Sequence, residues 1–211
     1  MARALHLYPE RPQRMHPRTR PSSSIRHARG FTLVELMIVV AIVGILAVLA
    51  IVGYRKLILA AHTSEATHMV QSIRVAEEAY HAEAQAYVST SVDGITGTYP
   101  SAAPGAFKTP WVVPVAPAGC TAAGGGQPAC FGLLPVHTDG PVVYGYATVA
   151  GAAGSAPPAI QVGATTLNGP AGASPTDWYW VTATGDPAGR GAPLSYVVGN
   201  SFVNDLWVQD Q

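Results

Sequence analysis

The fold is decided by one stretch near the N-terminus, RHARGFTLVELMIVVAIVGILAVLA, at residues 26–50. Gly30 ends a basic segment, and Phe31 opens an apolar run that continues to Tyr54. As a helix, these 24 residues would be about 36 Å long, enough to cross the roughly 30 Å hydrocarbon core of a bilayer. Glu35 is the one charged residue in the run, and a carboxylate in the middle of a bilayer costs roughly 3 kcal/mol on insertion scales. The run therefore predicts a membrane helix with an acid that needs an explanation.

The charge of the chain is unevenly distributed, although its formal net charge is zero. Residues 1–30 contain seven arginines and one glutamate, a net charge of +6. Residues 31–211 contain five basic residues and eleven acids, a net charge of −6. A basic leader is typical of a segment that stays in the cytoplasm while the body crosses the membrane. The acidic body lacks the basic face that a phosphate backbone requires, so no nucleic-acid binding is predicted for it.

Helical periodicity continues beyond the apolar run. Over residues 55–87, apolar side chains recur at helical spacing with polar residues largely between them, and the segment contains no proline. We therefore expect one helix over residues 31–87, with a membrane half at 31–54 and an amphipathic half after it. Its 57 residues would be about 85 Å long, which no single small domain can bury. Half of the helix must meet lipid or other protein.

Residues 88–211 have a different composition, in which 19 glycines and 14 prolines separate short β-branched and aromatic runs. The expected strands lie at 141–149, 159–167, 178–184, 194–198 and 201–209. Their spacing predicts an antiparallel sheet that packs on residues 66–87, preceded by about 50 residues of loop. The predicted fold class is therefore α+β, a long N-terminal helical spine packed on an antiparallel β-sheet head.

Aromatic residues alternate along the strand expected at 178–184. Trp178 and Trp180 share one face of this strand and Tyr179 has the other, so that some of these side chains face the core. A carbohydrate-binding platform is a secondary hypothesis for these aromatic residues.

The chain contains two cysteines, Cys120 and Cys130, on either side of a glycine-rich turn. One such pair cannot supply the four ligands of a structural zinc site. In an exported body, two cysteines so close in sequence most simply form one disulfide. Two unrelated free thiols are the alternative.

No arrangement in the sequence predicts an enzyme. His137 and Asp139 lie in a stretch rich in glycine and proline, which is more typical of a solvated turn than of a catalytic pair. The three histidines of the expected amphipathic helix lack the i, i+4 spacing of a metal-binding pair. The segment GDPAGRGAP, at 185–193, begins like a calcium loop, but the acids that should follow Asp186 are missing, so a turn is expected there. We expect no catalytic residue, no metal and no cofactor.

The residues around Gly30 resemble a known processing motif. No A-x-A triplet, the cleavage signal of an ordinary secretory leader, occurs in residues 41–62. Instead, a glycine directly precedes Phe-Thr-Leu-Val-Glu, and this G-FTLVEL stretch at 30–36 resembles the processing motif of type IV prepilins and of the related secretion-system pseudopilins. The resemblance is close over residues 29–54 and looser through the amphipathic helix. Beyond that helix it is one of architecture only.

The resemblance implies that a prepilin peptidase removes the leader at 1–30 by cutting between Gly30 and Phe31, and that the new Phe31 amine is methylated. The helix at 31–54 would then anchor the subunit in the bacterial inner membrane, with the leader cytoplasmic and the head periplasmic, until the subunit enters a filament. Glu35 would direct assembly by meeting the Phe31 amine of a neighbouring copy, or of its own chain. Favourable placement at a helix N-terminus by the dipole alone is the alternative.

Two features depart from the family's pattern. The leader is long, and Met15 is an alternative to Met1 as the initiator. Many relatives carry a helix-breaking proline near the end of the apolar run, where this chain has the sequence Ile-Val-Gly at 51–53. Any local melting of the helix would have to rest on Gly44 and Gly53 instead.

The favoured hypothesis is a structural subunit of a type IV pilus, a cell-surface filament that serves adhesion, twitching motility or DNA uptake. Its expected partners are copies of itself, the prepilin peptidase, the inner-membrane assembly machinery and, before assembly, membrane lipid. One alternative is a pseudopilin in the periplasmic pseudopilus of a type II secretion system. The major pseudopilins usually have a calcium-binding C-terminal region, so the missing acids at 185–193 favour the pilus. The other alternative, a signal-anchored periplasmic binding protein or enzyme, explains neither Gly30 nor Glu35.

Overall fold

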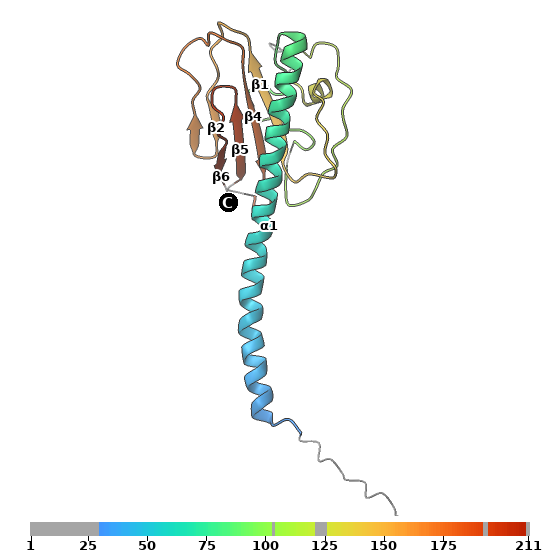
Figure 1. Ribbon diagram of the computed structural model, residues 1–211, viewed down its shortest axis with the longest axis vertical. Helices are drawn as coiled ribbons and strands as arrows, with labels where there is room; N and C mark the ends of the chain where they lie inside the picture. Colours follow the sequence, from blue (N-terminus) through green and yellow to red (C-terminus); the bar gives the residue numbers. More distant parts are fainter. Residues whose placement is uncertain (1–29, 103, 121–125, 192–193, 210–211) are drawn as a thin grey trace, which may run out of the picture. The chain divides into compact units, whose positions relative to one another are not determined.

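One long helix precedes a strand-rich region in the computed structural model, which describes residues 30–102, 104–120, 126–191 and 194–209 (Figure 1). The leader up to residue 29, with Met15, lies outside the described residues. The elements, in chain order, are α1 (Leu33–Ala84), the short 3-10 helix η1 (Pro128–Leu133), β1 (Gly145–Gly151), β2 (Ile160–Val162), β3 (Thr165–Leu167), β4 (Trp178–Gly185), β5 (Ser195–Asn200) and β6 (Trp207–Gln209).

The chain divides by its internal contacts into two units, with the boundary between Leu46 and Ala47 inside α1. The described part of the first unit contains the start of α1, and all of its side chains are exposed. The second unit contains the rest of α1, η1 and the described strands, and it holds the hydrophobic core.

Helix α1 confirms the predicted helical spine and ends slightly earlier than expected. Gln85 has a left-handed backbone with φ 56°, and its N–H donates to the His81 carbonyl at 2.9 Å. A residue in this conformation closes a helix, which explains why α1 stops at Ala84 rather than at Tyr87. Tyr87 turns into the core instead, where its side chain is 7% exposed.

Four strands form one antiparallel sheet in the order β1-β4-β5-β6, as the strand pattern predicted, and β2 pairs with β3 in a separate hairpin. The C-terminal part of α1 lies across the four-stranded sheet (Figure 1). Gly199 of β5 allows the helix to come close, because a Cβ there would lie 3.1 Å from Val70 and 3.0 Å from Arg74. The predicted packing of the sheet on residues 66–87 is therefore confirmed.

Two of the predicted strands are wrong in extent. The segment at 159–167 is a hairpin, in which β2 and β3 are joined through Gly163 with φ +57°, a conformation that favours glycine. The segment at 201–209 is a strand only in β6. The Asn200 side-chain oxygen accepts the backbone N–H groups of residues 202 and 203, at 2.9 and 2.8 Å. This local hydrogen bonding holds a turn where pairing was expected.

Strands β1, β4 and β5 of the four-stranded sheet are buried on both faces, whereas the edge strand β6 is partly exposed. On one face, Tyr179 and Val181 pack in a cluster with the side chains of α1. On the other face, Trp178 and Trp180 pack in a second cluster with Ile160 of the β2–β3 hairpin. The two tryptophans are 4% and 3% exposed, so the hypothesis of a carbohydrate-binding platform is wrong. The alternation along β4 was predicted correctly, but the cover over the second face was not.

Candidate processing and assembly site

The N-terminus of α1 is closed by a reciprocal cap between Thr32 and Glu35. The Thr32 hydroxyl accepts the Glu35 N–H at 3.2 Å. The Glu35 carboxylate accepts the Thr32 N–H at 3.0 Å and the Thr32 hydroxyl at 2.8 Å. This is a capping box, in which Thr-x-x-Glu satisfies backbone donors that a helix start leaves unpaired. The Thr-x-x-Glu spacing is present in the sequence, but neither the expected partner of Glu35, the Phe31 amine, nor the helix-dipole alternative took this cap into account.

Every side chain from residue 31 to residue 57 is exposed, including the whole apolar run at 31–54. Phe31, Met37 and Leu49 are 82%, 64% and 65% exposed. Among the described residues, α1 is the one helix that is long and apolar enough to cross a membrane. A contiguous apolar surface of this size marks a contact with lipid or protein. The segment is therefore suited to membrane anchoring.

The glycine before this segment and the two glycines within it have no explanation inside the described chain. A Cβ at Gly30, Gly44 or Gly53 would meet no other atom within 4 Å, and none of the three has the positive φ that favours glycine. Within a helix, glycine costs about 1 kcal/mol relative to alanine. Neither packing nor backbone conformation within the described residues therefore requires glycine at the predicted cleavage site.

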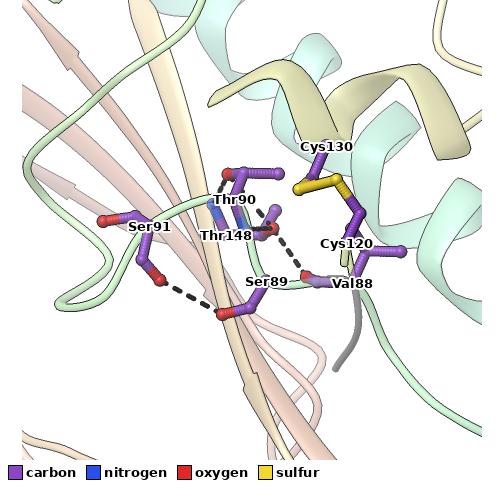
Figure 2. The surroundings of a disulfide bond; sticks show 7 residues. All are labelled: Val88, Ser89, Thr90, Ser91, Cys120, Cys130 and Thr148. Atoms are coloured by element: carbon purple, nitrogen blue, oxygen red, sulfur yellow. Dashed lines mark hydrogen bonds between the residues drawn. A yellow bond between two sulfur atoms is a disulfide. The ribbon is translucent and has the colours of Figure 1, made fainter. Parts of the chain in front are cut away.

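A disulfide joins Cys120 to Cys130, as their spacing predicted, with their Cα atoms 5.4 Å apart. Cys130 belongs to η1 and is fully buried. The bond lies among residues of the segment that follows α1 and of β1 (Figure 2). There, Thr148 of β1 donates its hydroxyl to the Val88 carbonyl at 2.8 Å, and its N–H to the Thr90 hydroxyl, also at 2.8 Å. The disulfide thus fastens the long loop where it meets the sheet.

Two adjacent glutamates hold the chain as it leaves α1. The Glu77 carboxylate is buried and accepts the Val88 N–H at 2.8 Å. Burial raises the pKa of Glu77 to about 8. The Glu78 carboxylate accepts the hydroxyls of Tyr87 at 3.2 Å and Tyr179 at 3.1 Å. Burial raises the pKa of Tyr179 to about 12, which keeps this hydroxyl a donor.

The role of Glu77 was not predicted, although the sequence carries a signal for it. Glu77 follows Val70 and Ile73 at helical spacing, on the stripe of α1 that faces the core. A glutamate at a core position is unusual and indicates a buried hydrogen-bonding role.

The loop after β4 is closed by Asp186, in agreement with the predicted turn. Its carboxylate accepts the N–H groups of Arg190 at 2.9 Å and Gly191 at 2.7 Å. The Gly189 N–H donates to the Asp186 carbonyl at 3.0 Å. The side chain that would begin a calcium loop is thus already hydrogen-bonded to the backbone of its own loop.

The histidine and aspartate of the candidate catalytic pair, His137 and Asp139, are both exposed. They flank Thr138, whose hydroxyl donates to the Gly140 carbonyl at 2.8 Å. This arrangement matches the predicted solvated turn. Across the described ranges, no group of three or more His, Cys, Asp or Glu residues could hold a metal ion.

Comparisons with known proteins match the N-terminal part of the chain. Residues 25–51 match the family described as "Prokaryotic N-terminal methylation motif". A fimbrial protein of Moraxella nonliquefaciens is 38% identical over 77 residues, covering 34% of this chain and 50% of the relative. A type IV major fimbrial protein of Dichelobacter nodosus is 38% identical over 71 residues, covering 33% and 44% of the two chains. A type IV major pilin protein of Myxococcus xanthus is 44% identical over 59 residues, covering 28% and 27%.

These matches span half or less of the relatives' own length. No solved structure matches the chain. The methylation motif and the named relatives support the type IV pilin family for this chain, as the resemblance of residues 29–54 predicted.

Proposed function

We propose that this chain, with its type IV pilin motif, is a structural subunit of a type IV pilus that assembles through its N-terminal helix. A prepilin peptidase removes the leader at 1–30 by cutting between Gly30 and Phe31, and the Phe31 amine is then methylated. One observation carries the proposal: a fully exposed apolar run opens directly after Gly30 and holds a single acid, Glu35. The motif match at residues 25–51 and the names of the relatives support it.

Before assembly, the apolar run at 31–54 holds the subunit in the inner membrane, with the leader cytoplasmic and the head periplasmic. The seven arginines of the leader support this orientation, because basic flanks stay on the cytoplasmic side. At this stage the cap with Thr32 supplies hydrogen-bond donors to the Glu35 carboxylate. An acid with donors close to the membrane surface costs less than one isolated in hydrocarbon.

During assembly, the apolar helices leave the lipid and pack against other copies. Apolar contact is non-directional, so it cannot by itself fix the axial register of one smooth helix on another. Cleavage creates a positive amine at Phe31, and Glu35 meets the amine of a neighbouring copy. The ion pair sets the register, and it forms only after processing because the precursor has no amine at this position.

Two observations favour the pilus over the pseudopilus of a type II secretion system. The relatives reported above are named as fimbrial or type IV major pilin proteins. In addition, the carboxylate of Asp186 is hydrogen-bonded to the backbone N–H groups of residues 190 and 191 in a loop without the further acids of a calcium site.

Three variants test the proposal by separating the charge of Glu35 from its cap. Glu35→Ala removes both, whereas Glu35→Gln removes the charge and keeps a side chain that suits a capping box. Thr32→Ala keeps the charge and weakens the helix start by about 1 kcal/mol. We expect both Glu35 variants to be processed and inserted but to form few or no filaments. Thr32→Ala should form filaments at close to the wild-type level.

The measurements are electron microscopy of the cells and the amount of subunit in a sheared surface fraction. Immunoblots of the membrane fraction provide the control, because they must show a processed pool of each variant. Normal filaments from Glu35→Gln would mean that the charge does not direct assembly. Normal filaments from Glu35→Ala would reject any assembly role for this acid.

A further inference from the structure

A hollow of about 300 Å³ lies between α1 and the loop after β4. The residues that line it are Arg55, Ile58 and Leu59 of α1 and Pro187, Ala188 and Arg190 of the loop. Two of these six side chains are guanidinium groups and the other four are apolar. The lining thus combines positive charge with apolar surface and contains no acid.

The backbone that carries Arg190 is fixed. The Asp186 carboxylate holds the N–H groups of Arg190 and of the following residue at 2.9 and 2.7 Å. Gly189 and Gly191, on either side of Arg190, have φ values of +66° and +80°, which side-chain-bearing residues rarely adopt. The local sequence therefore keeps an exposed arginine at one position beside the helix.

The two arginines of the hollow differ from Lys108 in forming no ion pair among the described residues. Elsewhere, Arg74 donates to the Asn204 carbonyl at 2.9 Å, and Lys108 pairs with Glu65 at 3.1 Å. None of the ion pairs among the described residues includes Arg55 or Arg190. Two like charges that line one hollow favour an anion between them.

Along α1, the hollow begins directly after the exposed apolar residues 47–54. Residues 47–54 of this helix expose apolar side chains and end at Tyr54, which is 66% exposed and directly precedes Arg55. Tyrosine and basic residues at the end of a membrane segment reach the headgroup layer of the bilayer. When residues 47–54 lie in lipid, the hollow therefore lies at the depth of the lipid phosphates.

We propose that this hollow binds the headgroup of an anionic phospholipid. Arg55 and Arg190 contact the phosphate, because the planar guanidinium group can donate two hydrogen bonds to it. Ile58, Leu59 and Pro187 contact the carbon atoms of the headgroup beyond the phosphate, while the acyl chains run back along residues 47–54. Inorganic phosphate shares the anionic chemistry but has no part that the apolar lining could hold. The proposal rests on the membrane-anchored stage of the proposed function, and it adds a lipid contact that the subunit must break to enter a filament.

The test measures which lipid the processed full-length subunit retains. The purified protein is incubated in detergent with equal amounts of phosphatidylglycerol and phosphatidylcholine, and bound lipid is counted by native mass spectrometry. We expect a clear preference for phosphatidylglycerol that Arg55→Gln combined with Arg190→Gln reduces about 25-fold. Each basic group near anionic lipid strengthens binding by about fivefold, so either single variant should have an intermediate effect. Lys108→Gln removes the same charge from another part of the surface and should leave the preference unchanged.

Three results would overturn the proposal: no lipid preference in the wild type, an unchanged preference in the double variant, or an equal loss in Lys108→Gln. Displacement of the lipid by an equimolar amount of inorganic phosphate would also overturn it, because the apolar lining would then contribute nothing. Thermal unfolding of each variant checks that the head is intact, which is expected because neither guanidinium belongs to an ion pair among the described residues. Lipid retention is measured without filaments, so it can fail while pilus assembly succeeds, and the reverse.

Discussion

The two halves of α1 differ in where their apolar side chains find partners. In the C-terminal half, Ala66, Val70 and Ile73 are completely buried against the rest of the chain. In the segment at 31–57, every side chain is exposed, and the cap between Thr32 and Glu35 is its clearest internal interaction. Internal contacts explain the sequence of the C-terminal half of α1 but not that of the segment at 31–57. The sequence of an unburied apolar helix has to be explained by lipid, by a processing enzyme or by other copies.

The largest effect is expected from Gly30→Leu. No contact within the described chain requires glycine at this position, so its proposed role is recognition by the peptidase. We predict that cleavage is abolished and that the precursor accumulates in the membrane. The matched control is Gly44→Leu, since a Cβ there also meets no atom within 4 Å. Immunoblots should show a processed protein for the control alone. Normal processing of Gly30→Leu would contradict the assignment of the cleavage site.

Glu77 provides the sharpest test in the buried half of α1. Its pKa is raised from 4.5 to about 8 in the folded protein, so between these values the folded state holds a proton that the unfolded state has released. The free energy of unfolding should therefore fall by roughly 1 kcal/mol for each pH unit over this range, and the stabilisation present at low pH is lost as the pH passes about 8. Glu77→Gln cannot titrate and should remove this slope.

The measurement for Glu77 is denaturant unfolding of the processed protein between pH 5 and pH 8, roughly the window between the two pKa values. Asp93 does not interfere, because hydrogen bonds to residues 95 and 96 lower its pKa to about 2, outside this window. An equal pH slope in the wild type and in Glu77→Gln would show that Glu77 is not the group responsible.

The disulfide should contribute less than this buried acid and should act only on the head. Replacing Cys120 and Cys130 together by alanine opens a loop with a sequence separation of 10, which corresponds to about 3 kcal/mol in the chain-entropy description. Thermal unfolding should show the loss, while cleavage at Gly30 should be unaffected. A double variant as stable as the wild type would mean that the loop is already fixed by Thr148 and its neighbours.

The smallest effect is expected from Lys108→Ala. Its ion pair with Glu65 spans 3.1 Å, but the two side chains remain 46% and 28% exposed. Pairs of this kind contribute about 0.2–1 kcal/mol and weaken as salt screens them. Denaturant unfolding at low and high salt should therefore give nearly equal stabilities for the variant and the wild type. A loss well above 1 kcal/mol would show that the loop around Lys108 depends on this pair.

Periodicity and composition were sufficient to predict the helical spine, the antiparallel sheet and the cysteine pair. The end of α1 could not be predicted, because Gln85 carries no sequence signal for a left-handed backbone. The cover over Trp178 and Trp180 arises from packing with a hairpin that is distant in sequence, which strand alternation alone does not reveal.

The candidate site shows the same division. The motif at 30–36 can be recognised from its residues, and the capping box was recognisable from the spacing of Thr32 and Glu35. The hollow that contains Arg55 and Arg190 could not be predicted, because the two arginines are far apart in sequence and meet only through the fold. Local patterns are therefore predictable here, while juxtapositions between α1 and the sheet loops require the structure.

The exposed half of α1 is explained by cleavage before Phe31. The most direct test of this cleavage is mass spectrometry of the N-terminal peptide from the membrane and surface forms of the protein. We predict a chain that begins at Phe31, with a methyl group on its amine. That start leaves Glu35 close to a new cation and leaves the apolar helix in place for the filament. A mature protein that begins after Ala50 or Ala61 would have lost the apolar run, and this result would contradict the proposed role of the N-terminal helix.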